Sequence, residues 1–362
     1  MTTPSRIDIE VSYRSDPVAL KNRLRRSRHD VEEVTIRLDS SFCAEGEPDN
    51  IEWQYPLLQA IGSGLSQTRT IKIQGPACAA HPLHLHCVTR ILEFCAGVVH
   101  LDLSSLKLKS WAEQDELAFW AVLEQQVSLE EFRMSGVWFH NVESRLMRLL
   151  ATLPNLKVVA IRATNSVSET VPSLFASHSL QKVVLFSTVL CDEASQALLA
   201  ALEQNTSVRE ASLGLTCGAS GGPALQQMLQ NNHTLEKLWI RINSLESDHD
   251  NQRIAQALRT AGHLLEFGLY GEKHVSAASE EFFVDVLRTD NMKLKVLELQ
   301  TPERISEEMH YLLLLNEVGR EELLHGAPPR QSWIQAIVNT RHDLNCLFYL
   351  LHANPMLCSS EI

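Results

Sequence analysis

Three apolar residues recur along this chain at a fixed spacing, and this pattern constrains the fold more than any other feature. Two variable residues separate the first apolar residue from the second, and one separates the second from the third. From Thr68 to Leu294 eight intervals cover 226 residues, a mean of about 28, which matches a known solenoid period. Thr68 and Ala211 are weak members of the series. The copies are Val31/Val34/Ile36, Thr68/Ile71/Ile73, Val98/Leu101/Leu103, Leu129/Phe132/Met134, Leu156/Val159/Ile161, Leu180/Val183/Leu185, Val208/Ala211/Leu213, Leu235/Leu238/Ile240, Leu264/Phe267/Leu269 and Leu294/Leu297/Leu299.

Each copy predicts a short strand followed by a helix. The last two apolar residues alternate with variable ones, which is the period of a strand with one buried face. Helical patterns follow: Asp192 can cap one helix, and Pro223 falls at the first position of another. Polar turns at 205–207 and 232–234 end these helices before the next strand. The apolar face of the helix after Asp192 is expected to hold Ala194, Ala197, Leu198, Ala201 and Leu202.

These residues resemble leucine-rich-repeat proteins of the ribonuclease-inhibitor-like class. The best copy runs from Leu235 through Leu238, Ile240 and Asn243 to Leu245 and keeps the asparagine position of that family, whereas the copy from Leu180 has Thr188 there. The resemblance implies an α/β solenoid of horseshoe shape, with short parallel strands on the concave face and helices on the convex face. We expect an N-terminal cap at 1–30, about ten repeats at 31–300 and a helical C-terminal cap at 301–362. Unrelated βαβ units are the alternative, which the regular spacing disfavours.

Both ends of the array need covering, because a solenoid leaves apolar faces open at its terminal repeats. Ile7, Ile9 and Val11 alternate with acidic residues and predict a capping strand. The basic cluster between Lys21 and Arg28 is expected to be the solvated face of a first helix, with nuclear import or phosphate binding as the alternative. Three helices are expected after Leu299. The stretch 311–320 resembles an element of uncharacterised leucine-rich-repeat proteins from unicellular algae, which implies no activity and suggests a hydrophobic lid.

Composition narrows the class of protein. The chain has 362 residues, more than one compact core usually supports, and a repeat array removes the need for a second domain. Its formal charge of −12 argues against broad attachment to nucleic acid or to anionic membranes. The N-terminus has no apolar segment of the secretory type, and the eight cysteines are scattered. We therefore expect a cytoplasmic protein, with the nucleus as the alternative compartment, and its oligomeric state stays open.

Two stretches carry residue patterns typical of catalytic or metal-binding sites. The sequence from Gly218 to Gly222 matches the nucleophile-elbow pattern around Ser220, but the preceding strand should end several residues earlier, near Gly214. A second stretch carries five possible zinc ligands, which is crowded for a tetrahedral site and favours a variable loop. We therefore predict no catalytic residue, no cofactor, no metal and no enzymatic activity, with zinc kept as the alternative. The five possible ligands are Cys78, His81, His84, His86 and Cys87.

The concave face is the expected binding surface. Variable residues beside the two inner apolar positions should point into it, and repeats five to nine place cations and aromatic rings there. Such residues dominate protein interfaces, and the cations suggest a protein or acidic peptide partner held by a non-enzymatic scaffold. Regulation of a small GTPase or another enzyme through the rim loops is the alternative. The predicted partner-binding residues are Arg162, Lys182, Phe186, Lys237, Trp239, Arg241 and Tyr270.

Overall fold

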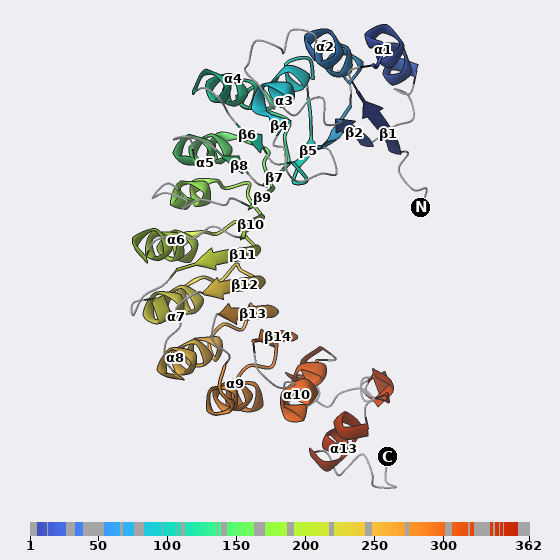
Figure 1. Cartoon of the computed structure of the whole chain (residues 1–362). Helices are drawn as coiled ribbons and strands as arrows, with labels where there is room; N and C mark the ends of the chain where they lie inside the picture. Colours follow the sequence, from blue (N-terminus) through green and yellow to red (C-terminus); the bar gives the residue numbers. More distant parts are fainter. Residues whose placement is uncertain are drawn as a thin grey trace. The chain divides into compact units, whose positions relative to one another are not determined.

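The computed structural model divides into two compact units, unit 1 (residues 1–190) and unit 2 (residues 191–362), which are described separately (Figure 1). The residues that it describes are 6–12, 14–26, 33–38, 54–65, 68–75, 83–95, 97–106, 108–109, 113–135, 137–138, 143–162, 171–186, 192–216, 221–242, 248–271, 275–300, 306–317, 319–321, 334–335, 337–339, 341–342 and 344–353.

Unit 1 contains a parallel sheet whose strands follow one another in sequence order. Adjacent strands pair in register, so that the apolar pair of one copy lies beside the apolar pair of the next; Ile36 lies opposite Ile73, for example. The first strand, predicted as a cap, pairs in parallel with the second. The strands are β1 (Arg6–Val11), β2 (Glu33–Leu38), β3 (Thr70–Gln74), β5 (His100–Leu103), β7 (Glu131–Ser135), β9 (Val158–Arg162) and β10 (Lys182–Phe186).

The helices of unit 1 connect these strands and pack side by side, each against the next. Leu20 and Leu24 of the first helix are buried, while Arg23 and Arg25 are exposed, so the described part of the basic cluster lies on a solvated helix face. The helices are α1 (Pro17–Arg26), α2 (Gln54–Gly64), α3 (Leu85–Leu92), α4 (Glu113–Glu124) and α5 (Glu143–Thr152), followed by a 3₁₀-helix, η3 (Val171–Ala176).

Unit 2 repeats the same alternation, and its helices follow one another along one face of its parallel strands (Figure 1). The strands are β11 (Glu210–Leu215), β12 (Lys237–Ile242), β13 (Glu266–Gly271) and β14 (Val296–Leu299). The helices are α6 (Asp192–Gln204), α7 (Gly221–Asn231), α8 (Asp248–Leu258), α9 (Ala277–Thr289), α10 (Glu307–Glu317) and α13 (Leu344–Ala353). The predicted fold class is confirmed: the chain is an α/β repeat solenoid.

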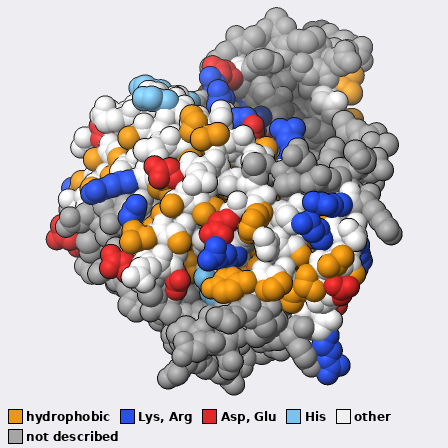
Figure 2. Space-filling model, turned by 90° about the horizontal axis from the view of Figure 1, so that it is seen from above, with side chains coloured by type: hydrophobic (Ala, Val, Ile, Leu, Met, Phe, Trp, Pro, Cys, Tyr) orange, Lys and Arg blue, Asp and Glu red, His pale blue; other side chains and the backbone are white. Residues whose placement is uncertain are grey.

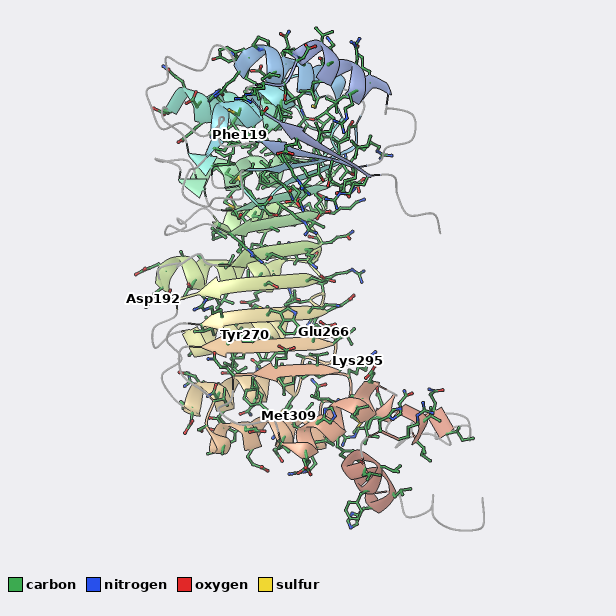
Figure 3. The ribbon with its side chains drawn as sticks, turned by 45° about the vertical axis from the view of Figure 1, so that its right-hand side comes forward. Phe119, Asp192, Glu266, Tyr270, Lys295 and Met309 are labelled. Carbon is green, nitrogen blue, oxygen red and sulfur yellow. The ribbon has the colours of Figure 1, made fainter. Side chains whose placement is uncertain are left out.

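The core of each unit is built from the apolar pairs of the repeat. The two inner apolar residues are buried in every copy, including the weak member Ala211, and Phe119 adds a fully buried ring in unit 1 (Figure 3). Each buried Leu, Ile, Val or Phe side chain stabilises the fold by about 1.5–3 kcal/mol. The expected buried face of α6 was wrong at one position: Ala197 is exposed, and Ser195 is buried. The Ser195 hydroxyl can be buried because it accepts a hydrogen bond from the backbone N–H of Thr216 (3.2 Å).

Buried asparagines join successive repeats in unit 2. Asn232 lies three residues before Leu235, and its side-chain oxygen accepts hydrogen bonds from the N–H groups of Thr234 (3.0 Å) and Leu235 (2.9 Å). Its amide donates to the carbonyls of Leu202 (2.7 Å) and Asn205 (3.1 Å) in the preceding repeat. Asn232 thus satisfies buried backbone groups of two repeats. We call Asn205, Asn232, Asn291 and Asn316 the asparagine ladder.

The asparagine ladder continues into α10, beyond the last predicted repeat. The Asn316 amide donates to the carbonyls of Asn291 (3.1 Å) and Leu294 (2.8 Å). Gly319 follows with φ of 90°, a left-handed conformation that favours glycine after a helix. Arg320 is buried and donates to the carbonyls of Leu287 and Arg288 at the end of α9. The element predicted as a hydrophobic lid is thus also a polar cap on the last helix of the array.

The C-terminal region contains further helical residues. Ser306 caps α10, because its hydroxyl accepts a hydrogen bond from the N–H of Met309 (3.2 Å). Residues 334–335 and 337–339 are helical, and α13 packs against α10. None of the helices in the described part of the chain is both long enough and apolar enough to cross a lipid bilayer.

Two features of unit 1 were not predicted. A second parallel sheet contains strands of only two residues, too short to show a period in sequence. The repeat that begins at Leu156 is shorter than the others, because the next copy begins 24 residues later. Its helical segment is the six-residue η3 in place of a full α-helix. The strands of the second sheet are β4 (Leu83–His84), β6 (Leu108–Lys109) and β8 (Val137–Trp138).

Candidate functional site

The sheet of unit 2 presents a row of partly exposed side chains on the face opposite its helices, and we call this surface the open face. It alternates with the buried residues along the strands, as predicted, except that Gly214 and Gly268 at two of its positions are themselves buried. Glu266 and Tyr270 stand on it near opposite ends of β13 (Figure 3). The residues of the open face are Glu210, Ser212, Gly214, Lys237, Trp239, Arg241, Glu266, Gly268, Tyr270, Val296 and Glu298.

The structure brings together four of the predicted binding residues on the open face. Lys237, Trp239 and Arg241 alternate along β12, and Arg241 lies opposite Tyr270 of β13 in the register of the strands. The other three predicted residues belong to unit 1. There Arg162 of β9 lies opposite Phe186 of β10, and Lys182 lies opposite Val158.

Trp239 is held against the neighbouring strand. Its register partner is Gly268, and a Cβ atom at that glycine would stand only 2.2 Å from Cε3 of the indole. The indole therefore lies directly over the glycine backbone, where a side chain would displace it. The Trp239 and Tyr270 rings are stacked, with centroids 6.2 Å apart and planes at 19°. The two rings form a half-buried aromatic surface that is fixed by the sheet.

Tyr270 is fixed in turn by β14. Its hydroxyl donates a hydrogen bond to the carboxylate of Glu298. Burial raises the pKa of Tyr270 above its ordinary value, and the Glu298 carboxylate raises it further. The phenol is therefore neutral at physiological pH and can donate its proton in the hydrogen bond to Glu298. Side-chain contacts thus run from Trp239 of β12 through Tyr270 of β13 to Glu298 of β14.

Lys237 is not an available cation. Its ammonium group pairs with the Glu266 carboxylate at 2.8 Å. This hydrogen bond, together with the charges of Glu266, Glu210 and Glu236, raises the pKa of Lys237. A partner that used Lys237 would first have to separate this pair.

Arg241 differs from Lys237. It is exposed, and no carboxylate of the described residues lies within ion-pair distance of it. Its register neighbour on β11 is Gly214, which has no side chain to cover the guanidinium group. Arg241 is therefore the cation of the open face that can accept a new carboxylate.

Several charges on the corresponding face of unit 1 already have partners, although Arg162 is exposed and has no carboxylate partner among the described residues. Arg37 pairs with Asp8 (3.1 Å) and Lys72 with Asp102 (3.4 Å). Farther along that sheet Glu131 contacts both His100 (3.2 Å) and Arg133. Partnered, solvent-exposed charges of this kind contribute little to binding. On the molecular face seen in Figure 2, basic and acidic side chains are likewise interspersed.

The structure describes only part of the two stretches with catalytic or metal-site patterns. Cys78, His81 and Ser220 lie outside the described residues, and so do the side chain of His84 and residues Asn243 and Leu245 of the best repeat copy. Within the described part, no cluster of three or more His, Cys, Asp or Glu residues could hold a metal ion. Cys87 is buried, and its thiol contacts the Gln54 side-chain oxygen (3.4 Å).

His86 is expected to make the stability of unit 1 depend on pH. Burial, assisted by the Arg90 charge, lowers the pKa of His86 from 6.5 to about 4. Because the unfolded chain takes up this proton at a higher pH than the folded chain, the stabilisation is complete above about pH 6.5 and is lost as the pH falls towards 4. The loss should reach about 3 kcal/mol.

The test compares urea unfolding at about pH 7 and about pH 4.5 for the wild type and His86→Gln. The variant should lose less stability over this range than the wild type. His249→Gln, which changes an exposed histidine of α8, is the control and should behave like the wild type. Equal losses in wild type and His86→Gln would show that His86 does not carry this dependence.

No protein-family model matches this chain, and no curated protein is significantly similar to it.

Proposed function

We propose that this chain is a leucine-rich-repeat protein of the ribonuclease-inhibitor-like class that binds a protein partner on the open face of unit 2 and has no enzymatic activity. Repeated strand–helix units and a parallel sheet in sequence order support the class. The observation that carries the function is the Trp239–Tyr270 stack, which is half-buried, lies over Gly268 and is outside the buried core.

Trp, Tyr and Arg are the residue types that dominate protein interfaces, because they bury a large area and keep a polar group. Ordering such side chains on binding costs about 0.5–1.5 kcal/mol each. Here the sheet orders the two rings when the chain folds. The free-energy cost of ordering them is therefore part of folding and does not weaken binding. The open face is thereby prepared for a partner.

Residence in a reducing compartment, the cytoplasm or the nucleus, forms part of the proposal. Cys87 and Cys95 are free thiols, which suits such an environment. The alternative function, regulation of a GTPase through rim loops, depends on segments such as 217–220 and 243–247 that lie outside the described residues. No feature of the described residues favours it over the open face.

Trp239→Ala combined with Arg241→Glu is expected to abolish partner recovery. Affinity purification from the native source with wild-type bait should recover at least one protein that the double variant recovers at least about tenfold less, because both anchors of the interface are lost. Quantitative mass spectrometry measures the ratio.

The matched control removes a similar pair from the helical side of unit 1. There the Arg90 guanidinium lies over the ring of the exposed Tyr55, 5.1 Å from its centroid. Tyr55→Ala with Arg90→Glu should leave the recovered proteins unchanged. Identical recovery by the wild type and the Trp239/Arg241 variant would reject the open face as the binding surface.

A further inference from the structure

We infer that the partner of the open face is an extended peptide segment that carries an Asp or Glu two residues away from a large apolar side chain. The inference rests on the proposed function and adds to it the chemistry and the spacing of the ligand. Arg241 would bind the carboxylate, and Trp239 would contact the apolar side chain.

The sign of the ligand charge beside Arg241 follows from this cation. Glu266 is paired with Lys237 at 2.8 Å, and Glu298 of β14 accepts the hydrogen bond of the neutral Tyr270 hydroxyl. Arg241 is exposed and has no carboxylate partner among the described residues. A carboxylate that approaches Arg241 gains a charge-assisted hydrogen bond without breaking an existing pair. A basic ligand group would meet an unpaired cation of the same sign.

The position of the apolar group follows from the strand. Trp239 and Arg241 are separated by one residue of β12, so they stand on the same face about 7 Å apart. An extended ligand has the same rise, and residues i and i+2 on one side of it are also about 7 Å apart. An acidic residue and an apolar residue at that spacing can therefore contact Arg241 and Trp239 together.

The β11 side of this pair carries only small residues. The register neighbours of Trp239 and Arg241 on β11 are Ser212 and Gly214, which have a small side chain and none. On the β13 side the Trp239 ring already covers Gly268 and stacks on Tyr270. We therefore expect the ligand to lie over β11 and β12, with its apolar side chain against the free side of the indole.

Random peptides displayed on phage provide the test, with the full-length chain immobilised. Peptides selected on the wild type and depleted against the Trp239→Ala/Arg241→Glu variant should be enriched for Asp or Glu two residues from an aromatic or large aliphatic residue. Selection on Arg241→Glu should replace that acidic residue by Lys or Arg, whereas Lys237→Ala should leave the motif unchanged. Both positions are on the partly exposed open face, and circular dichroism verifies that each variant is folded.

One peptide from the wild-type selection then provides a charge-reversal experiment. Arg241→Glu should weaken its binding at least about tenfold, and a peptide with Lys in place of its acidic residue should recover most of that loss on the variant. Selected peptides that lack the acidic residue, or that bind Arg241→Glu as well as the wild type, would overturn the inference while leaving the proposed function in place. If no peptide is enriched over the Trp239/Arg241 double variant, the inference is overturned, whereas the proposed function is decided separately by the affinity purification.

Discussion

Asn232→Ala is expected to lower the free energy of unfolding by about 3 kcal/mol, although it removes only a small polar side chain. The substitution leaves the N–H groups of Thr234 and Leu235 without their acceptor, and it removes one of the two donors to each of the carbonyls of Leu202 and Asn205. Each buried group that loses its hydrogen bond costs about 1–3 kcal/mol, and water entering the vacated space recovers part of the sum. Urea unfolding followed by circular dichroism measures the difference.

The adjacent residue gives the matched control. Asn231 belongs to α7 and is exposed, and its amide contacts the exposed carboxylate of Glu203 (2.7 Å). Asn231→Ala should change stability by less than about 0.5 kcal/mol. Equal effects of the two substitutions would show that Asn232 does not join the repeats.

The asparagine ladder also explains how the repeats keep their spacing. Asn291 repeats the geometry of Asn232: it accepts from the N–H of Leu294 (2.9 Å) and donates to the carbonyl of Leu258 (2.7 Å) in the previous repeat. Ala261 occupies the equivalent position in the repeat between them, three residues before Leu264. Asn232 and Asn291 therefore each form hydrogen bonds with backbone groups of their own repeat and of the preceding one.

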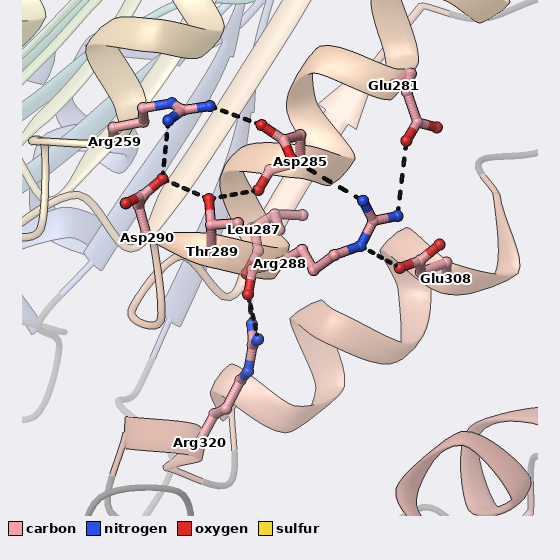
Figure 4. A network of polar contacts seen from close by, with 9 residues as sticks. All are labelled: Arg259, Glu281, Asp285, Leu287, Arg288, Thr289, Asp290, Glu308 and Arg320. Atoms are coloured by element: carbon pink, nitrogen blue, oxygen red, sulfur yellow. Dashed lines mark hydrogen bonds and ion pairs between the residues drawn. The ribbon is translucent and has the colours of Figure 1, made fainter. Parts of the chain in front are cut away.

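Arg320→Met is expected to loosen α10 from the array. Arg320 is buried and donates to the carbonyls of Leu287 and Arg288, which end α9 (Figure 4). Burial lowers the pKa of Arg320 below its ordinary value, although the group stays charged and compensates the negative end of the helix dipole. Loss of both hydrogen bonds should cost about 3 kcal/mol, which is a fall of about 100-fold in the protection of α10 amides.

Hydrogen exchange of the intact chain measures this effect residue by residue. The amides of β12 and β13 should keep their protection, because both hydrogen bonds of Arg320 go to carbonyls of α9. Arg25→Met, which removes an exposed arginine of α1, is the control and should leave α10 unchanged. Unchanged exchange of α10 in Arg320→Met would mean that Arg320 does not hold it. The exposed pairs nearby, such as Arg288 with Glu308 (2.9 Å), cannot replace these buried bonds.

Much of the fold could be predicted from the sequence, because the repeated spacing of apolar residues identifies the side chains that are buried in the core. The inner apolar residues of each copy had to face the core, and they are buried from Val34 to Leu299. The alternation of apolar and polar residues also placed Trp239, Arg241 and Tyr270 on the exposed side of their strands. These positions depend only on the period of a strand, which is a local property.

Interactions between repeats could not be predicted in the same way, because they depend on register. The sequence contains Gly268 and Trp239, but only the pairing of β12 with β13 places the indole over the glycine. The same register gives Lys237 its partner Glu266 and leaves Arg241 exposed, so the count of cations overstated the charge available to a partner. Asn232 was predicted to lie in a turn, and its bonds to the preceding repeat appear only when the repeats are stacked.

The dissociation constant between the full-length chain and the protein recovered by affinity purification tests the central claim most directly. Trp239→Ala with Arg241→Glu should raise it at least about 100-fold, or about 2.7 kcal/mol, because the aromatic surface and the available cation are lost together. Tyr55→Ala with Arg90→Glu should leave it within about twofold of the wild type. A dissociation constant that changes equally little in both variants would contradict the assignment of the open face as the binding surface.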